Sequence, residues 1–362
     1  MVFVSVLGLL FAVLVVCDAA ATVLHPDAEG LLAGSIRKVV WRTAAFASAR
    51  LPRAARRMLS LAGPVILLAT FVVWIVLLTL GLAVAVWPTM EEDFKLQPGL
   101  APVTFLDALY FAGGTVPVLG YGDITPVSTE GQLVSLFGAA VGFALFTGMA
   151  TYAIQVTSGV SKRNRFTLAV HDDVRGLGGV TVFAEYLARD GVGETRAHCR
   201  SWTESLREID EMVHRYPLVA FTYRSRRDEY DPEPALRRLA EISVAALVAS
   251  GRDPALRASA ESLCRALVRL QRTIAGTYFG KHVARRLADP RPTEDDRRAV
   301  DTVDRMLTAR LDGSPGADHG IGREHGDEHD RAVETVHLCR VFLEGLHEWA
   351  RTEAPPQEWE TR

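Results

Sequence analysis

A glycine-flanked tyrosine, Gly120-Tyr121-Gly122, lies about a third of the way along the chain and is followed directly by Asp123. A cation that has lost its hydration shell needs several oxygen ligands, and backbone carbonyls supply them when successive residues turn their C=O groups toward one axis. Such a backbone alternates left-handed and ordinary conformations, and glycine adopts the left-handed ones without a Cβ penalty. The pattern therefore predicts a cation-coordinating backbone segment at Val118, Leu119, Gly120, Tyr121, Gly122 and Asp123.

Three apolar stretches surround this segment, at residues 1–24, 63–87 and 131–157. Each exceeds the roughly 20 residues that a helix needs to cross the hydrocarbon core of a bilayer, so we expect three transmembrane helices. Residues 104–116 are also apolar but too short to span, and they lead directly into the glycine segment. We interpret them as a re-entrant pore helix, because non-helical backbone at membrane depth must be buried in protein or line a wet cavity.

The distribution of basic residues predicts the orientation of the spans. Seven Lys or Arg residues lie in the segment 25–61, whereas the loop after the second span carries Lys95 beside three acidic residues. The positive-inside rule places 25–61 and the C-terminal region in the cytoplasm, with 88–130 and the N-terminus outside. The run Asp18-Ala19-Ala20-Ala21 is compatible with signal-peptide cleavage, but the basic n-region is missing, so we predict that the first span is retained in a multi-pass cell-membrane protein.

The motifs Phe105–Phe111 and Gly120–Pro126, followed by Gly142 nineteen residues after Asp123, resemble the pore domain of the potassium channel superfamily. The resemblance implies that the six residues named above form a selectivity filter that holds K⁺ ions, with Asp123 at its outer mouth. Because four filter segments surround an ion and each chain has one, it also implies a homotetramer. It assigns Gly142 as a gating hinge, although close helix packing is an alternative role for this glycine. The residues implied to line the inner cavity are Phe143, Phe146, Ala150 and Ile154.

The filter departs from the family pattern at its inner end. Pro117 and Val118 replace two threonines, and Leu119 replaces a valine. Val118 has no hydroxyl to offer to the innermost ion site, so we hypothesise a potassium-preferring pore with a weakened inner site. The alternatives are a poorly selective cation channel and a non-conducting membrane receptor or scaffold with a pore-like fold.

The basic segment 25–61 predicts no voltage sensor. Arg50, Arg53 and Arg56 are spaced every third residue, but they lie with Pro52 in a polar stretch that is not a span. Residues 33–58 are instead compatible with an amphipathic helix on the inner leaflet, where basic side chains would meet anionic lipid. The side chains expected to face lipid are Val39, Val40, Trp41, Ala45 and Phe46.

Residues 159–362 follow the expected pore domain, 62–158, and their charged residues alternate with apolar ones. Asp231-Pro232 and Asp253-Pro254 each predict a capped helix start, and further helices are expected over 201–215, 293–311 and 330–351. The expected fold is therefore an α-helical membrane protein with an all-α cytoplasmic bundle. The nearest match to a dinucleotide fingerprint is Gly176-Leu177-Gly178-Gly179, whose spacing is wrong, so no organic cofactor is predicted.

Histidines and acids are concentrated in a glycine-rich stretch at 312–330 that includes His319, His325 and His329. A divalent-metal or proton sensor is one interpretation, because histidine ligates metals and titrates near neutral pH. The glycines favour a solvated linker instead. Nothing in the sequence indicates a nucleophile and base pair, an enzymatic activity or a nucleic-acid partner, and the regulator of the cytoplasmic region is not indicated.

Overall fold

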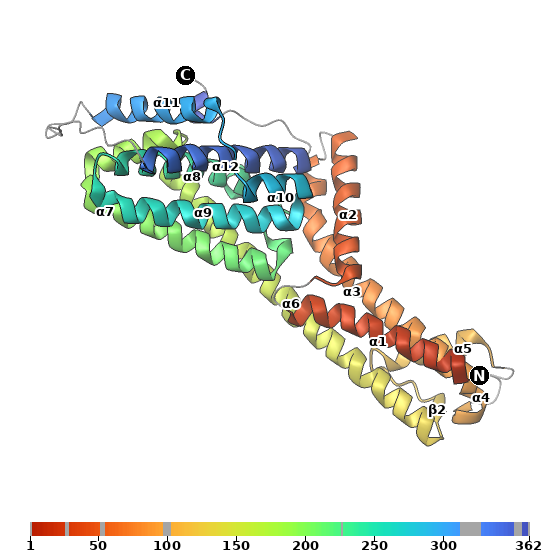
Figure 1. Cartoon of the computed structure of the whole chain (residues 1–362). Coiled ribbons are helices and arrows are strands. Elements are labelled where there is room, and N and C mark those ends of the chain that lie inside the picture. Colours follow the sequence, from red (N-terminus) through yellow and green to blue (C-terminus); the bar gives the residue numbers. More distant parts are fainter. Residues whose placement is uncertain are drawn as a thin grey trace. The chain divides into compact units, whose positions relative to one another are not determined.

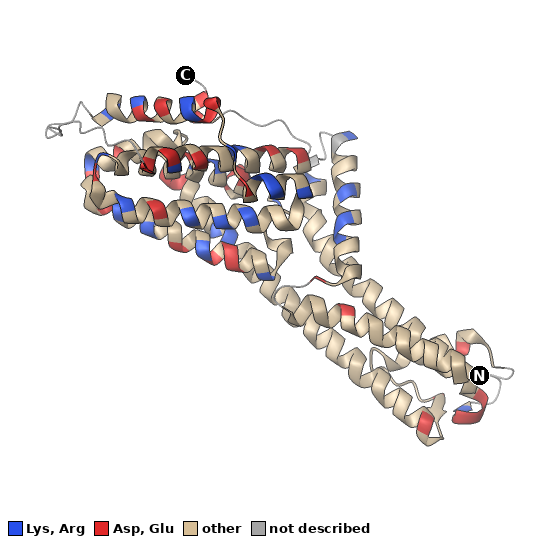
Figure 2. Ribbon diagram, in the orientation of Figure 1, with Lys and Arg blue, Asp and Glu red and all other residues tan. Residues whose placement is uncertain are grey.

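The computed structural model describes residues 2–25, 29–50, 55–96, 103–225, 227–311, 327–350 and 357–360. The protein is an α-helical membrane protein (Figure 1). It divides into two compact units, Met1–Thr157 and Ser158–Arg362, and each is treated separately below. Charged side chains are sparse on the long helices of the first unit and frequent on the helices of the second (Figure 2).

The first unit contains the predicted spans. Helix α1 covers Val2–Leu24, α3 covers Ala55–Val86, and α6 begins at Thr129. These three helices are long and apolar enough to cross a membrane, which confirms the expectation of three candidate spans. Helix α6 extends to Val174, well beyond the predicted end at residue 157, so one continuous helix contributes to both units.

Small residues allow α1 and α3 to pack closely. A Cβ on Gly8 would lie 2.5 Å from the Ala85 nitrogen, and one on Gly81 would lie 3.1 Å from the Ala12 nitrogen. Such close approach is characteristic of membrane helix pairs, which gain contact area from small residues.

Asp18, the acidic residue within the first span, accepts a hydrogen bond on each of its two carboxylate oxygens. The fully buried Trp74 on α3 donates its indole N–H to Asp18 Oδ2 at 2.9 Å, and the Leu32 amide donates to Oδ1 at 2.9 Å. A carboxylate at membrane depth needs such partners. It therefore joins α1 both to α3 and to the start of the next helix.

That next helix, α2 (Leu31–Arg50), packs against α3. Trp41 and Ala45 are buried, so the expectation that they face lipid is wrong, because packing between α2 and α3 covers this side of the helix. Val39 and Phe46 are exposed, and basic residues recur along α2 (Figure 2).

The second unit is an all-helical bundle, as predicted. Its helices are α7 (Gly179–Arg215), α8 (Pro232–Ser250), α9 (Arg257–Tyr278), α10 (Lys281–Ala288), α11 (Glu294–Leu311) and α12 (Asp327–Ala350). Short 3₁₀ turns occur at Pro217–Val219 (η2), Asp228–Tyr230 (η3), Pro254–Leu256 (η4) and Glu358–Glu360 (η5). The predicted helices 293–311 and 330–351 correspond to α11 and α12. The predicted helix 201–215 is only the last part of α7, which turns sharply at Gly191, where φ is 74°.

The two predicted caps differ in outcome. Asp231 caps α8 by accepting the Glu233 amide, with Pro232 at the first helical position. Asp253 accepts the Ala255 amide, but the residues that follow form the turn η4, and α9 begins only at Arg257. The second helix start was therefore predicted about one turn too early.

A buried arginine holds the end of α6 within the second unit. The Arg163 guanidinium donates to the carbonyl oxygens of Val219, Ala220 and Tyr223 at 2.7, 2.9 and 2.7 Å. Arg163 is 2% exposed, and buried carbonyls need donors of this kind. The segment after α7 is thus fastened to α6.

Candidate functional site: the pore segment

The pore helix is α5, Phe105–Thr115, one residue shorter at each end than predicted. Thr104 and Asp107 form a capping box at its start, where Asp107 Oδ2 accepts from the Thr104 amide at 2.8 Å and from the Thr104 hydroxyl at 2.7 Å. These bonds place the Asp107 carboxylate at the positive end of the helix, where a negative charge is favourable. The negative end of α5 therefore faces the glycine segment.

Amide groups of the filter segment bond back to the pore helix. Leu119 N and Gly120 N donate to the Gly114 carbonyl at 2.8 and 3.2 Å, and Val118 N donates to the Thr115 carbonyl at 3.0 Å. Within the described part of the chain, no hydrogen bond ends on a carbonyl oxygen of residues 118–121. The amides of residues 118–120 are thus satisfied, while the carbonyl oxygens of residues 118–121 stay available.

The backbone of the segment alternates in handedness. The φ angles of Val118, Gly120 and Gly122 are 62°, 61° and 85°, and the intervening Leu119 and Tyr121 have no positive φ. The positive values at the two glycines match the sequence-based reasoning. The value at Val118 was not anticipated, because a β-branched residue with positive φ is a genuine outlier that costs about 1–3 kcal/mol.

Two pore-helix residues brace the filter and were missed by sequence reasoning. Tyr110 stacks on Tyr121 with ring centroids 5.3 Å apart and an interplanar angle of 12°. Gly114 makes room for the Tyr121 ring, because a Cβ there would lie 3.1 Å from ring atom Cδ2. The spacing within FLDALYFAGG is helical, but no pattern in it identifies these contacts.

A small antiparallel sheet fixes the outer end of the filter. Strand β1 (Phe94–Leu96) pairs with β2 (Ile124–Pro126), which begins directly after Asp123. The Val127 amide donates to the Asp93 carbonyl at 2.7 Å. The chain that leaves the filter is therefore tied to α4 (Met90–Asp93), a short helix that lies between α3 and β1.

Comparison with known proteins agrees with this geometry. A family model described as "Ion channel" matches residues 65–158. The chain is 46% identical over 55 residues to two-pore potassium channel 2 of Arabidopsis thaliana, covering 14% of this chain and 12% of the relative. Residues 65–158 form a pore domain of the potassium channel superfamily. This ion-channel region belongs to a chain with three helices long and apolar enough to cross a membrane.

A second relative, from Bacillus subtilis (strain 168), is named uncharacterized membrane protein YdjJ. It is 32% identical over 114 residues, which are 32% of this chain and 33% of the relative. The chain thus spans a third or less of the length of either relative. No solved structure matches the chain.

On the inner helix of the pore domain, Gly142 is pressed against the pore helix. A Cβ at this position would lie 1.9 Å from the Val116 carbonyl oxygen and 2.7 Å from its carbonyl carbon. Helix α6 is continuous through Gly142. This contact fits the close-packing role, and the hinge role stays a prediction.

The expected cavity residues share one exposed side of α6. Phe143 and Ile154 are 65% and 66% exposed, and Phe146 and Ala150 are exposed as well. Gly142, Met149, Tyr152 and Val156 point the other way and are buried. The pore domain therefore leaves the predicted cavity face uncovered in a single chain.

The histidine-rich stretch contributes little to a site. His319 and His325 lie outside the described residues, and His329 is in the first turn of α12. Among the residues that the structure describes, no group of three His, Cys, Asp or Glu side chains could hold a metal ion. The metal hypothesis therefore gains no support from the described residues.

Proposed function

We propose that the protein is a potassium-preferring channel whose filter consists of Val118, Leu119, Gly120, Tyr121, Gly122 and Asp123. The proposal rests on a difference between the backbone N–H groups and the backbone C=O groups of the filter. The amides of residues 118–120 bond to the pore helix, while the carbonyl oxygens of residues 118–121 accept no hydrogen bond from the described residues. Carbonyl oxygens left in this way can replace the hydration shell of K⁺ ions.

A homotetramer follows from what one chain leaves uncovered. Val118, Leu119 and Tyr121 are 54%, 58% and 62% exposed, although they lie in a non-helical segment of a membrane domain. Such backbone is tolerated only where protein or a water-filled cavity surrounds it. Four copies around one axis provide both conditions, because they enclose the filter and place Phe143, Phe146, Ala150 and Ile154 around a common inner cavity.

The inner end of the filter supports a second candidate, a poorly selective cation channel. Val118 supplies no hydroxyl oxygen to the innermost site, and its φ of 62° is strained for a branched side chain. Selectivity depends on the number and field strength of the coordinating oxygens. We therefore expect conduction with potassium preferred, but with the inner site weaker than in a threonine-containing filter.

In the proposed orientation the N-terminus is outside, and both α2 and the second unit are cytoplasmic. Arg37 on α2 is buried and makes a bidentate ion pair with Glu29, with both distances 2.8 Å. Lys38, Arg42 and Arg50 are exposed on the outer side of the helix. These three cations, rather than Arg37, are the groups that would contact anionic lipid.

The test is a set of recordings from the purified full-length protein in planar bilayers under a potassium/sodium gradient. We expect a reversal potential displaced toward the potassium equilibrium value. Val118→Thr should displace it further, because threonine keeps the branched shape and adds the hydroxyl. Val118→Ala is the matched control, which relieves crowding without adding an oxygen.

The outcomes separate the candidates. A reversal potential near zero with clear current would establish the poorly selective channel. Absence of current from a protein that is tetrameric by light scattering would favour a non-conducting receptor or scaffold. A monomer in the native bilayer would remove the proposal altogether.

A further inference from the structure

Helix α7 begins without a cap of its own. Its N-cap residue is Gly178, which has no side chain, and the preceding turn contains Arg175 and Gly176 at φ 51° and 77°. The first amides of any helix lack partners within the helix and need acceptors from elsewhere. The glycine-rich stretch that resembled a nucleotide motif is therefore a helix start whose amides must be satisfied from outside.

Glu358, near the C-terminal end of the chain, supplies these acceptors. Its Oε2 accepts from Val180 N at 2.8 Å and from Thr181 N at 3.3 Å, and its Oε1 accepts from the Thr181 hydroxyl. The Gly179 amide donates a hydrogen bond to Glu241 Oε2 at 2.7 Å. Two of the first amides of α7 are thus capped by Glu358 on η5, which lies 178 positions from Val180 and 177 from Thr181 in the sequence.

The absence of a side chain at Gly178 is what admits this carboxylate. A Cβ on Gly178 would lie 1.9 Å from Glu358 Cδ and 2.1 Å from its Oε2. The φ and ψ of Gly178 are −75° and 153°, which any residue adopts. Glycine is therefore required here by the space that Glu358 fills and not by the backbone conformation.

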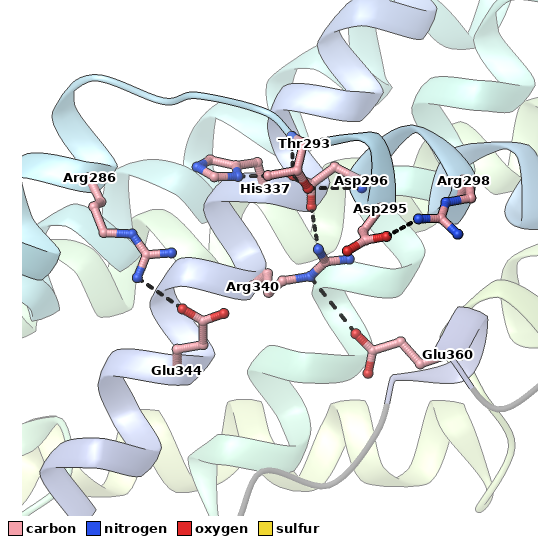
Figure 3. Close-up of polar contacts among 9 residues, drawn as sticks. All are labelled: Arg286, Thr293, Asp295, Asp296, Arg298, His337, Arg340, Glu344 and Glu360. Atoms are coloured by element: carbon pink, nitrogen blue, oxygen red, sulfur yellow. Dashed lines mark hydrogen bonds and ion pairs between the residues drawn. The ribbon is translucent and has the colours of Figure 1, made fainter.

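The residues around Glu358 are also anchored, and we call Gln357–Glu360 the C-terminal strap. Trp359 is 4% exposed and belongs to the core of the second unit. Glu360 lies 3.9 Å from Arg340, whose guanidinium is paired at 2.9 Å with the buried Asp296 on α11 (Figure 3). The strap therefore contacts the bundle through an apolar anchor, an ion pair and a helix cap.

The caps of α8 and α11 are local by comparison. Asp231 caps α8 two residues before the amide that it accepts from, and Asp296 bonds to Thr293 at the start of α11. A local cap stays with its helix whenever the helix is formed. The bonds that Glu358 makes to the start of α7 are lost whenever the strap leaves its place, and a helix start with fewer capping bonds is less stable.

We propose that the C-terminal strap is a releasable regulatory element of the channel. When seated, it holds the start of α7 and with it the turn 175–178 that joins α7 to α6. When released, it frees this turn and the last residues of α6, the helix that also carries the cavity residues. This inference rests on the proposed function, because it is the conduction of the pore that the strap would regulate.

The test compares full-length wild type with Glu358→Ala and Gly178→Ala in proteoliposomes. The first variant removes the carboxylate, and the second keeps it but fills its place, so both should release the strap. The matched control is Glu344→Ala, which removes an exposed carboxylate of α12 that is paired with Arg286 at 2.9 Å (Figure 3). The two readouts are hydrogen exchange over residues 178–184 and potassium flux.

We expect exchange at Val180 and Thr181 to rise at least about tenfold in both strap variants, since bonds to a charged acceptor are lost. We also expect potassium flux to change at least about twofold in both, with the control unchanged in both readouts. Unchanged exchange would overturn the contact itself. Raised exchange with unaltered flux in a conducting protein would overturn the regulatory role. A wild type that conducts no ions would overturn the proposed function and the regulatory role together, while the exchange data would still decide the contact.

Discussion

Replacing Gly142 by alanine separates the two roles that this glycine was given. The added Cβ would lie 1.9 Å from the oxygen and 2.7 Å from the carbon of the Val116 carbonyl. Both atoms belong to the backbone at the end of the pore helix, and Val116 is fully buried, so no side-chain rotation relieves the overlap. Either α6 or the pore helix has to move.

The size of the effect follows from this geometry. Inserting one carbon into a well-packed site costs about 1–3 kcal/mol, and an overlap with backbone belongs at the upper end of that range. An alanine in a helix interior recovers at most about 1 kcal/mol through its higher helix propensity. We therefore expect the membrane unit to lose about 2 kcal/mol of stability, which amounts to more than a tenfold change in an equilibrium constant.

Gly148 provides the matched control on the same helix. A Cβ there would meet only Val23 Cγ1, at an ordinary contact distance of 3.7 Å. We expect Gly142→Ala to lower the melting temperature of the purified full-length protein by several degrees and to move the reversal potential, because the pore helix holds the filter. Gly148→Ala should leave both values unchanged or raise the melting temperature slightly.

Equal melting temperatures and reversal potentials for the two variants would refute the packing argument. If Gly142→Ala kept its stability and its selectivity but changed only the open probability, the hinge role would be the correct one. The comparison thus decides between the roles with one substitution and one control.

Three further changes test other parts of the structure. Arg163→Met leaves the carbonyl oxygens of Val219, Ala220 and Tyr223 without this donor. We expect the free energy of unfolding of the second unit, measured by chemical denaturation, to fall by about 2–4 kcal/mol, with Arg163→Lys intermediate. An unchanged denaturation midpoint would contradict the role of Arg163 in holding these carbonyls. Asp18→Ala removes the acceptor of the Trp74 indole and should reduce the folded yield of the membrane unit, measured by size-exclusion chromatography, whereas Asp18→Asn should retain part of it. Burial opposes ionisation of Asp296, but hydrogen bonds from Thr293 and His337 outweigh it and lower its pKa. Because this folded-state pKa lies below the unfolded value near ~3.9, the stabilisation is present above that value and is lost as the pH falls through the folded pKa. Asp296→Asn should therefore flatten the loss of stability on acidification below about pH 4, and a melting profile as steep as that of wild type would count against this assignment.

Features of this protein that depend on residues close together in the sequence could be predicted from the sequence alone. The three long apolar stretches are visible in composition alone, since a bilayer imposes a minimum length on any helix that crosses it. The positive φ angles at Gly120 and Gly122 follow from the residue type, and the cap of α8 follows from Asp231 preceding a proline. The match to the potassium channel superfamily rests on the same local pattern.

Features that depend on distant residues needed the tertiary structure. The lipid-facing interpretation of Trp41 failed because the side of α2 that α3 covers is a property of the packed pair. The stacking of Tyr110 on Tyr121 joins the pore helix to the filter, whose relative placement no sequence pattern specifies.

The glycine-rich stretch at 176–179 shows the difference most directly. From the sequence alone it was a poor nucleotide motif, and its actual use, as the seat of Glu358, depends on a contact across 178 positions. Helical periodicity, capping and span length are set by interactions within about one or two turns of chain, so residue order determines them. Which distant carboxylate reaches a helix start is decided only when the whole bundle packs, because only then do such groups come within hydrogen-bonding distance.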